Sequence, residues 1–157
     1  MSGQTYLVTG AAGFVGSRLS RAILNRNPFD RVVGVDNLND YYAREHKDRH
    51  LADLRPEKRF TFIKADLREA DRLKSIFAEQ KPNAVAHLAA MAAVRYSIEH
   101  PLVYGEVNVQ GSMNLMDAAR MNGNPRMVLA STGSLYGKDT PVPFVETAAA
   151  GLPLVVC

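Results

Sequence analysis

The chain has 157 residues, of which 46% are hydrophobic and 22% charged, and its formal net charge is +3. This length corresponds to one domain of ordinary size, and the composition excludes collagen, a disordered tail and a disulfide scaffold. No apolar stretch approaches the about 20 residues of a membrane span, and the first 16 residues lack the pattern of a secretory signal. The 19 basic residues are scattered among 16 acidic ones, which argues against a nucleic-acid partner. Because the lone Cys157 cannot form an internal disulfide, we expect a cytoplasmic protein.

Short β-rich runs alternate with helical patterns along the chain. Apolar and β-branched residues predict strands at residues 6–9, 31–35, 59–63, 83–88 and 126–130. Amphipathic spacing predicts helices at residues 14–25, 71–80 and from 101 to about 123. Residues 37–58 are polar and charged, and we interpret them as a loop with room for a short helix. Beyond residue 130 no element is predicted.

This alternation implies right-handed crossovers and a parallel sheet. The predicted fold class is therefore α/β, a Rossmann-type doubly wound parallel sheet of about five strands in the order 3-2-1-4-5.

Three glycines, Gly10, Gly13 and Gly16, form a GxxGxxG pattern between the first predicted strand and the first helix. Glycine serves there for a tight turn, for close approach of a pyrophosphate and for packing of the helix on the strand. The helix start at Phe14 and Val15 would add N–H donors and a partial positive charge for the phosphates. On its own, the pattern fits a closely packed turn equally well.

Asp36 follows Gly16 by 20 residues and ends the second predicted strand. A carboxylate at this place accepts hydrogen bonds from a ribose diol. It would also repel a 2′-phosphate, so the predicted cofactor is NAD rather than NADP. The adjacent Asn37 is included in the predicted site.

Several segments together resemble a known family. Residues 9–16, followed by Asp-Asn-Leu-Asn-Asp-Tyr-Tyr at 36–42, are similar to the extended short-chain dehydrogenase/reductase superfamily. Within it, the chain resembles the NAD-dependent epimerase/dehydratase family, and most of all the epimerases that act on UDP-glucuronate. His-Leu-Ala-Ala at 87–90, Ala-Val-Arg-Tyr-Ser at 93–97 and Ser-Thr-Gly-Ser-Leu-Tyr-Gly at 131–137 carry the same resemblance, which covers residues 3–153.

The resemblance implies further cofactor contacts. Asp66 and Leu67 would lie beside the adenine, and the backbone of Ala89 and Ala90 would lie close to the pyrophosphate and ribose. Asn108, on the long predicted helix, would reach toward the cofactor.

The resemblance also implies a substrate site for a UDP-sugar. Thr132 matches the family's catalytic Ser/Thr, whose hydroxyl hydrogen-bonds the sugar 4-OH as it becomes a ketone, and Ser131 and Ser134 stand beside it. Arg95 and Ser97 match substrate contacts, because a guanidinium suits the carboxylate of a uronate.

Each of these assignments has a purely structural alternative. Asp66 could cap the following helix, and Asn108 could be a packing contact between helix and strand. Thr132 could be an ordinary hydroxyl at a strand end, and Arg95 a solvated surface charge.

The histidines favour structural interpretations more strongly. His87 is interpreted as a hydrogen-bonded buried residue rather than a base. His46 and His50 have the i, i+4 spacing of metal ligands, but no third ligand is nearby, so we interpret them as a solvated face and predict no metal.

The chain departs from the family at the catalytic base. The family uses a Tyr with a Lys four residues later, because a phenol with a pKa near 10 needs a nearby cation to ionise at neutral pH. No tyrosine here has a lysine at that spacing; Tyr136, for example, is followed by Thr140. By its distance from Thr132, Cys157 stands about where the Tyr is expected.

We therefore expect an NAD-binding Rossmann domain at residues 1–137 and a truncated, irregular tail at 138–157. Three functions remain open. The chain is the NAD-binding half of a UDP-glucuronate 4-epimerase-like enzyme, inactive alone; a non-catalytic NAD-sensing or interaction module; or one chain of a split epimerase or dehydratase. Dehydration is disfavoured because Gly133 and Ser134 stand where a 4,6-dehydratase would place an acidic pair after Thr132.

The expected partners follow from the same truncation. The fifth strand would be an open edge, and the helix at 105–121 would have a bare apolar face. We therefore expect a homo-oligomer or a complementing chain, with neither a nucleic acid nor a membrane as partner.

Overall fold

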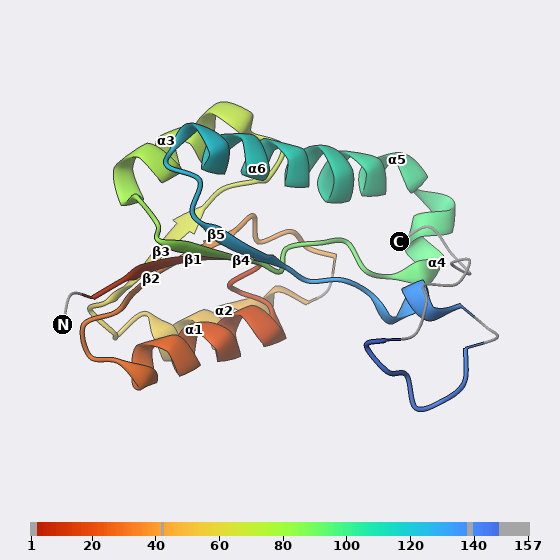
Figure 1. The fold of residues 1–157 in the computed structure, drawn as a ribbon, viewed down its shortest axis with the longest axis horizontal. Coiled ribbons are helices and arrows are strands. Elements are labelled where there is room, and N and C mark those ends of the chain that lie inside the picture. Colours follow the sequence, from red (N-terminus) through yellow and green to blue (C-terminus); the bar gives the residue numbers. More distant parts are fainter. Residues whose placement is uncertain (1–2, 42, 138–139, 148–157) are drawn as a thin grey trace.

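The computed structural model describes residues 3–41, 43–137 and 140–147. Five strands form one parallel sheet in the order β3-β2-β1-β4-β5 (Figure 1), which confirms the predicted α/β class and strand order. The strands are β1 (Thr5–Thr9), β2 (Arg31–Asp36), β3 (Phe60–Lys64), β4 (Ala84–His87) and β5 (Arg126–Leu129).

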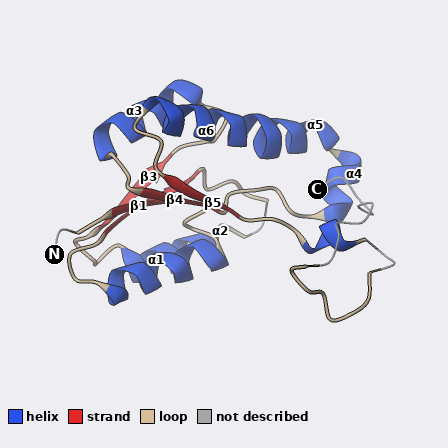
Figure 2. Cartoon of the chain, viewed as in Figure 1, coloured by secondary structure: helices blue, strands red, loops and turns tan. Residues whose placement is uncertain are grey.

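Helices cover both faces of this sheet (Figures 1 and 2). On one face lie α1 (Phe14–Arg26) and α2 (Arg44–Leu54). On the other lie α3 (Ala70–Gln80) and α6 (Gly111–Met121). The short α4 (Val94–Glu99) and α5 (Pro101–Tyr104) follow β4, and the π-helical η1 (Gly105–Gln110) joins α5 to α6. No helix of the described ranges is long and apolar enough to cross a bilayer.

The core consists of two apolar layers, one on each side of the sheet. Because successive side chains of a strand point to opposite faces, Leu7 packs with α3 and α6 while Val8 packs with α1 and α2. Both are at most 1% exposed, as expected for a central parallel strand. Burial of a large side chain such as Phe77 contributes about 1.5–3 kcal/mol to the layer formed with α3 and α6.

The register of the sheet brings the carboxyl ends of its strands to one edge. Thr9 of β1 pairs with Val35 of β2 and with His87 of β4. The chain order reverses between β1 and β4, and ligands of doubly wound sheets bind in the crevice outside such a reversal. The candidate site is expected at this edge.

Three local predictions need correction. The segment 37–58 contains the full helix α2, whose buried Lys47, Leu51 and Leu54 make a narrow i, i+4, i+7 stripe among exposed charges. The short helix α4 was not predicted. The helix predicted from residue 101 is continuous to Met121, but η1 interrupts its α-helical pattern.

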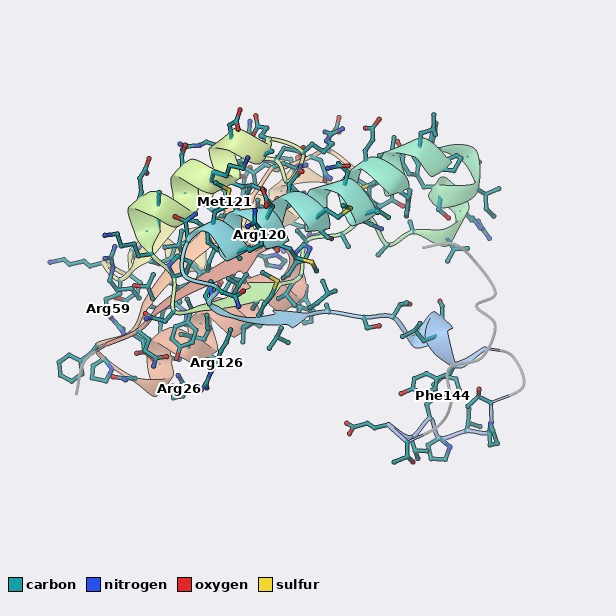
Figure 3. The ribbon with its side chains drawn as sticks, turned by 45° about the horizontal axis from the view of Figure 1, so that its top comes forward. Arg26, Arg59, Arg120, Met121, Arg126 and Phe144 are labelled. Atoms are coloured by element: carbon teal, nitrogen blue, oxygen red, sulfur yellow. The ribbon has the colours of Figure 1, made fainter. Side chains whose placement is uncertain are left out.

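The segment after β5 lies apart from the sheet. It contains one 3₁₀ turn, η2 (Gly133–Tyr136), where no element was predicted. Phe144 lies well away from the strands (Figure 3), and its ring stacks on that of Tyr136 at 4.6 Å between centroids. The boundary at residue 137 stays a prediction, and Cys157 lies outside the described residues.

Candidate functional site

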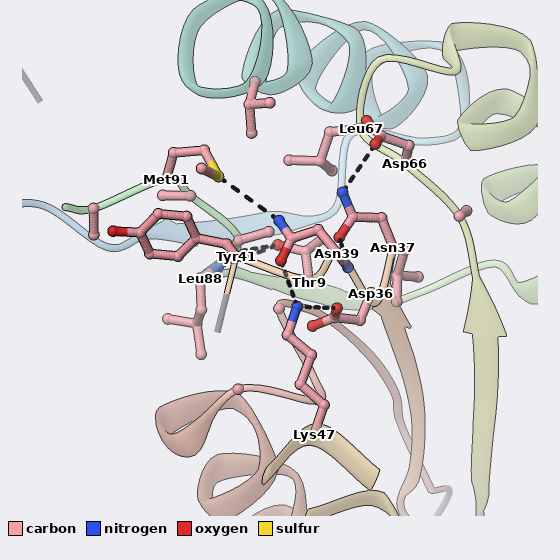
Figure 4. A pocket seen from close by; sticks show the side chains of 18 of the residues that line it. Thr9, Asp36, Asn37, Asn39, Tyr41, Lys47, Asp66, Leu67, Leu88 and Met91 are labelled. Carbon is pink, nitrogen blue, oxygen red and sulfur yellow. Dashed lines mark hydrogen bonds and ion pairs between the residues drawn. The ribbon is translucent and has the colours of Figure 1, made fainter. Parts of the chain in front are cut away.

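A cavity of about 380 Å³ opens at the carboxyl edge of the sheet (Figure 4). Its walls come from the ends of β1, β2, β3 and β4, from the loops that follow them, and from Lys47 of α2 and Val107 of η1. Among its lining residues are eight of the predicted cofactor contacts: Gly10, Gly13, Asp36, Asn37, Asp66, Leu67, Ala89 and Ala90. The fold therefore gathers most of the predicted cofactor residues around one space.

The glycine turn is shaped as the motif predicts. Gly10 has a φ of +69°, and a Cβ there would lie 2.9 Å from the backbone nitrogen of Ala89. A Cβ at Gly16 would overlap the carbonyl oxygen of Gly10, so helix and strand are in direct backbone contact. The Gly13 N–H donates to Gly10 O at 3.0 Å and closes the turn.

The start of α1 is open to an anion. Its N-cap, Gly13, offers no side-chain cap, and no acidic residue lies in the first turn. The N–H groups and the positive end of the helix dipole are therefore not neutralised by the helix itself. The side chains of Phe14 and Val15 are exposed and lie outside the cavity lining, so their contribution to a ligand would come from the backbone.

Asp36 is buried at the end of β2 and holds both neighbouring loops. Its Oδ2 accepts from Ala12 N at 3.1 Å, and its Oδ1 accepts from Leu38 N at 2.8 Å. Lys47 Nζ lies 3.5 Å from Oδ1 and donates to Asn39 Oδ1 at 2.7 Å. The carboxylate is thus fixed in place at the cavity wall and paired with a cation from α2.

Asp66 also lines the cavity, and its carboxylate accepts several hydrogen bonds. Its carboxylate accepts from the Arg68 side chain at two atoms, from Arg68 N and from Asn37 Nδ2, each at 2.9 Å. The Arg68 hydrogen bonds hold the pKa of Asp66 well below its usual range. Since Glu69 Oε2 also accepts from Asp66 N at 2.9 Å, this residue closes the turn before α3 as well as lining the cavity.

The loop after β4 forms the opposite wall. Leu88 N and Ala89 N both donate to Thr9 Oγ1 at 3.2 Å. Asn108 binds the backbone of Met91 at both of its amide atoms, at 2.8 and 2.9 Å. Asn108 thus makes the structural contacts expected if it serves packing between helix and strand. Direct contact of Asn108 with a cofactor stays a prediction.

The predicted substrate residues lie elsewhere. Thr132 is exposed, and its Oγ1 accepts from Ser134 N at 3.2 Å. Ser131 and Arg95 are exposed, whereas Ser97 is buried and donates to Val94 O at 2.6 Å. Within the described ranges, none of the five predicted substrate and catalytic residues (Arg95, Ser97, Ser131, Thr132, Ser134) belongs to the cavity lining.

The structural interpretation of the histidines is right for His87 and only partly right for His46 and His50. His87 is 1% exposed and hydrogen-bonded on both ring nitrogens, as the structural alternative predicted. His46 is exposed, but His50 is half-buried, and its Nδ1 contacts Ala12 O at 2.9 Å, so the solvated-face interpretation is wrong for His50. The described residues contain no cluster of three or more potential metal ligands.

Several cavity residues were not predicted as site residues, among them Asn39, Tyr41 and Lys47. Tyr41 also packs edge-on against Tyr96 of α4 at 5.1 Å between ring centroids. The available signal was their proximity in sequence to Asp36, but only the helix α2 turns Lys47 back toward that carboxylate.

The sheet order, the glycine turn, the acid at the end of β2 and the cavity define a Rossmann-type domain of the dinucleotide-binding class. The sequence profile of the GDP-mannose 4,6 dehydratase family matches residues 7–151. The chain therefore belongs to this family of nucleotide-sugar epimerases and dehydratases.

Individual relatives are 4-epimerases. The UDP-glucuronate 4-epimerase of Thermodesulfobacterium geofontis is 42% identical over 149 residues, which are 95% of this chain and 45% of that protein. The UDP-glucose 4-epimerase of Thermus thermophilus, solved with NAD, is 35% identical with a TM-score of 0.79, covering 96% of this chain and 45% of that one. An epimerase of Stenotrophomonas maltophila, solved with NAD and formylated UDP-arabinopyranose, is 31% identical with a TM-score of 0.78, covering 94% and 43%. The chain thus spans less than half the length of these relatives.

Proposed function

We propose that this chain is the NAD-binding half of a nucleotide-sugar 4-epimerase, and that these 157 residues bind NAD without completing the reaction. The observation that carries the proposal is the pairing of an uncapped helix start at Gly13 with the buried carboxylate of Asp36 across one cavity. The relatives solved with NAD support the choice of cofactor.

The residues present fit two parts of the cofactor, its pyrophosphate and its adenosine ribose. At Gly10 a Cβ would lie 2.9 Å from Ala89 N, so only glycine lets this turn lie so close to the loop after β4. The turn leads directly to the uncapped N–H groups of α1, which suit a pyrophosphate. A carboxylate accepts about four hydrogen bonds. Asp36 accepts one hydrogen bond at each oxygen, from Ala12 N at Oδ2 and from Leu38 N at Oδ1, and Lys47 forms an ion pair with Oδ1. Oδ2 therefore keeps an acceptor site for a ribose hydroxyl.

Asp66 imposes a condition on adenine binding. Its four acceptor sites are filled by Arg68 and Asn37. An adenine amino group would therefore replace one of these donors, and Asn37 is the donor that shares the cavity wall. Leu67, half of the predicted adenine contact, supplies an apolar surface beside it.

NAD, where bound, would supply the hydride acceptor and donor for a transient oxidation at C4 of the sugar. The chain's own part in that chemistry is to hold the cofactor and, in this proposal, to place the Thr132 hydroxyl near the 4-OH and Arg95 near the carboxylate of a UDP-glucuronate-like sugar. The sequence contains no Tyr-x-x-x-Lys to accept the 4-OH proton. We therefore propose binding without turnover.

The test separates binding from turnover. Calorimetric titration of the folded chain with NAD should give saturable binding, whereas incubation with NAD and UDP-glucuronate should give no UDP-galacturonate. Turnover by these 157 residues would overturn the proposed role of the absent pair. Loss of NAD binding would overturn the whole proposal.

An exposed apolar surface supports a complementing chain as a second candidate. β5 ends the sheet, and its Val128 is 70% exposed. Leu102 of α5 and Met113 of α6 are 80% and 58% exposed. Such a strand edge and helix face associate readily with another chain. Co-expression with the C-terminal half of a 4-epimerase relative should restore epimerase activity if that half is the partner.

A further inference from the structure

His87 lies buried between two hydroxyl groups from different elements. Its Nδ1 lies 2.7 Å from Thr9 Oγ1 at the end of β1, and its Nε2 lies 2.9 Å from Ser112 Oγ at the start of α6. The ring therefore bridges the central strand and the helix that covers it.

The contact with Ser112 determines that His87 Nε2 carries a proton. Ser112 Oγ lies 2.5 Å from the carbonyl oxygen of Asn108, and a carbonyl only accepts. The single hydroxyl proton of Ser112 is therefore donated to Asn108 O. Ser112 Oγ must then accept from the ring, so His87 Nε2 carries a proton.

The contact with Thr9 determines whether the other ring nitrogen, His87 Nδ1, carries a proton. Thr9 Oγ1 accepts from Leu88 N and from Ala89 N, which fills both of its acceptor sites. Its own proton is left for donation to His87 Nδ1, which therefore carries none. Both ends assign the same neutral Nε2–H tautomer, in agreement with the burial that lowers the pKa of this imidazole.

The resulting hydrogen bonds run in one direction through the site. They lead from the N–H groups of Leu88 and Ala89 to Thr9, then to His87, to Ser112 and to Asn108 O. Asn108 holds the other end of the same loop, because its side chain binds both backbone groups of Met91. The loop 88–91 is thus fixed at both ends by groups that His87 connects.

We infer that His87 is a positioning residue, which as the neutral Nε2–H tautomer holds the loop 88–91 at the cofactor cavity. The inference rests on the proposed function for its ligand, since Ala89, Ala90 and Met91 line the cavity where we place NAD. The approach is close: a Cβ on Gly10 would lie 2.9 Å from Ala89 N. A small displacement of this loop would therefore alter the space beside the glycine turn.

The tautomer can be observed directly. In the chain labelled with ¹⁵N-histidine, NMR at pH 7 should show a protonated Nε2 and an unprotonated Nδ1 for His87, assigned by the loss of its signals in His87→Asn. The opposite tautomer, or a doubly protonated ring, would overturn the inference.

Ser112→Ala tests the positioning role, because Ser112 lies outside the cavity lining and acts on the loop through His87. We expect faster hydrogen exchange at the Leu88 and Ala89 amides and an NAD dissociation constant about fivefold higher, the size of one lost hydrogen bond. Ser112→Thr keeps the hydroxyl and should restore both values. Unchanged exchange in folded Ser112→Ala would contradict the inference.

The matched control is Ser20→Ala. Ser20 is fully buried and donates to Gly16 O at 2.8 Å, the same bond to the carbonyl four residues back that Ser112 makes, but it takes no part in the relay. This variant should lose comparable stability without changing exchange at Leu88 and Ala89. If the wild-type chain binds no NAD, the proposed function fails, while the tautomer and the exchange rates still decide the role of His87 in holding the loop.

Discussion

Lys47 Nζ lies 3.5 Å from Asp36 Oδ1, and the two side chains are only 5% and 7% exposed (Figure 4). The carboxylate at the end of β2 therefore does not meet the cofactor cavity as an isolated negative charge. The cation comes from α2 and also donates to Asn39 Oδ1. We therefore expect the preference between NAD and NADP to depend on both residues, whereas the sequence alone pointed to Asp36.

Asp36→Asn should shift the preference toward NADP. The substitution replaces the negative charge with a neutral amide, which no longer repels a 2′-phosphate, and keeps the Lys47 cation beside the position proposed for the ribose. We expect NAD affinity to fall about tenfold, as for loss of a charge-assisted hydrogen bond, and NADP affinity to rise above that of the wild type. Calorimetry with both cofactors measures this, and Asp36→Asn/Lys47→Met should lose the gain for NADP. Equal NADP affinity in the single and double variants would exclude a role of Lys47.

Lys47→Met should destabilise the fold. Removing one partner of a buried ion pair leaves an uncompensated charge, which costs about 3–5 kcal/mol. We expect a loss of about 3 kcal/mol in the free energy of unfolding, measured in urea. The double variant with Asp36→Asn should lose less than the sum of the two single variants. Strict additivity would mean that the pair does not interact.

Gly16→Ala should disrupt the phosphate turn. The new Cβ would overlap the Gly10 carbonyl, so α1 must move away from β1. We expect a loss of about 1–3 kcal/mol in stability, as for overpacking, together with loss of NAD binding. Gly105→Ala is the control, because a Cβ there meets nothing within 4 Å, and it should leave stability the same or slightly higher. Equal effects of the two substitutions would contradict the close contact between α1 and β1.

His87 should make the fold sensitive to mild acid. Burial lowers its pKa in the folded chain, whereas the unfolded chain takes up a proton near the ordinary histidine value of about 6.5. The unfolded state then binds more protons, so stability is lost as pH falls below that value, by at most about 2 kcal/mol between pH 6.5 and 5. Urea unfolding at pH 7.5, 6 and 5 measures the loss, and His87→Asn should reduce it. The same slope in that variant would assign the proton uptake to another group.

Asp66 should make the stability of the fold depend on pH in a separate, more acidic pH range. Its pKa is lowered in the folded chain, chiefly by the Arg68 side chain. Its stabilising contribution is therefore present above the ordinary aspartate value of about 3.9 and is lost as pH falls below it. Arg68→Ala should weaken this dependence below pH 4 and leave the range between pH 6.5 and 5 unchanged, as unfolding measured from pH 3 to 6.5 would show.

The sheet and the phosphate turn could be predicted because their signals are local. Gly10, Gly16 and Asp36 occupy positions whose geometry depends on a few neighbouring residues and a fixed spacing. Lys47 could not be predicted, since its contact with Asp36 depends on α2, a helix whose three buried residues stand among many charges. The contact between His87 and Ser112 could not be predicted either, because Ser112 is 25 residues away in the sequence and reaches the ring only when α6 packs on the sheet.

The predicted substrate residues could not be derived from local sequence signals. Thr132 and Arg95 were selected through family resemblance, and both lie outside the cavity that the described residues form. Their proposed roles rest on the resemblance alone, because neither side chain contributes to the cavity that would hold the cofactor.

The most direct test of the central claim is a calorimetric titration of the folded 157-residue chain with NAD, beside Asp36→Ala and Gly10→Val. We predict saturable binding of one NAD per chain, weakened at least tenfold in both variants while their circular dichroism stays that of a folded protein. Absence of binding up to millimolar NAD, or equal binding by all three proteins, would contradict the assignment of this cavity to the cofactor.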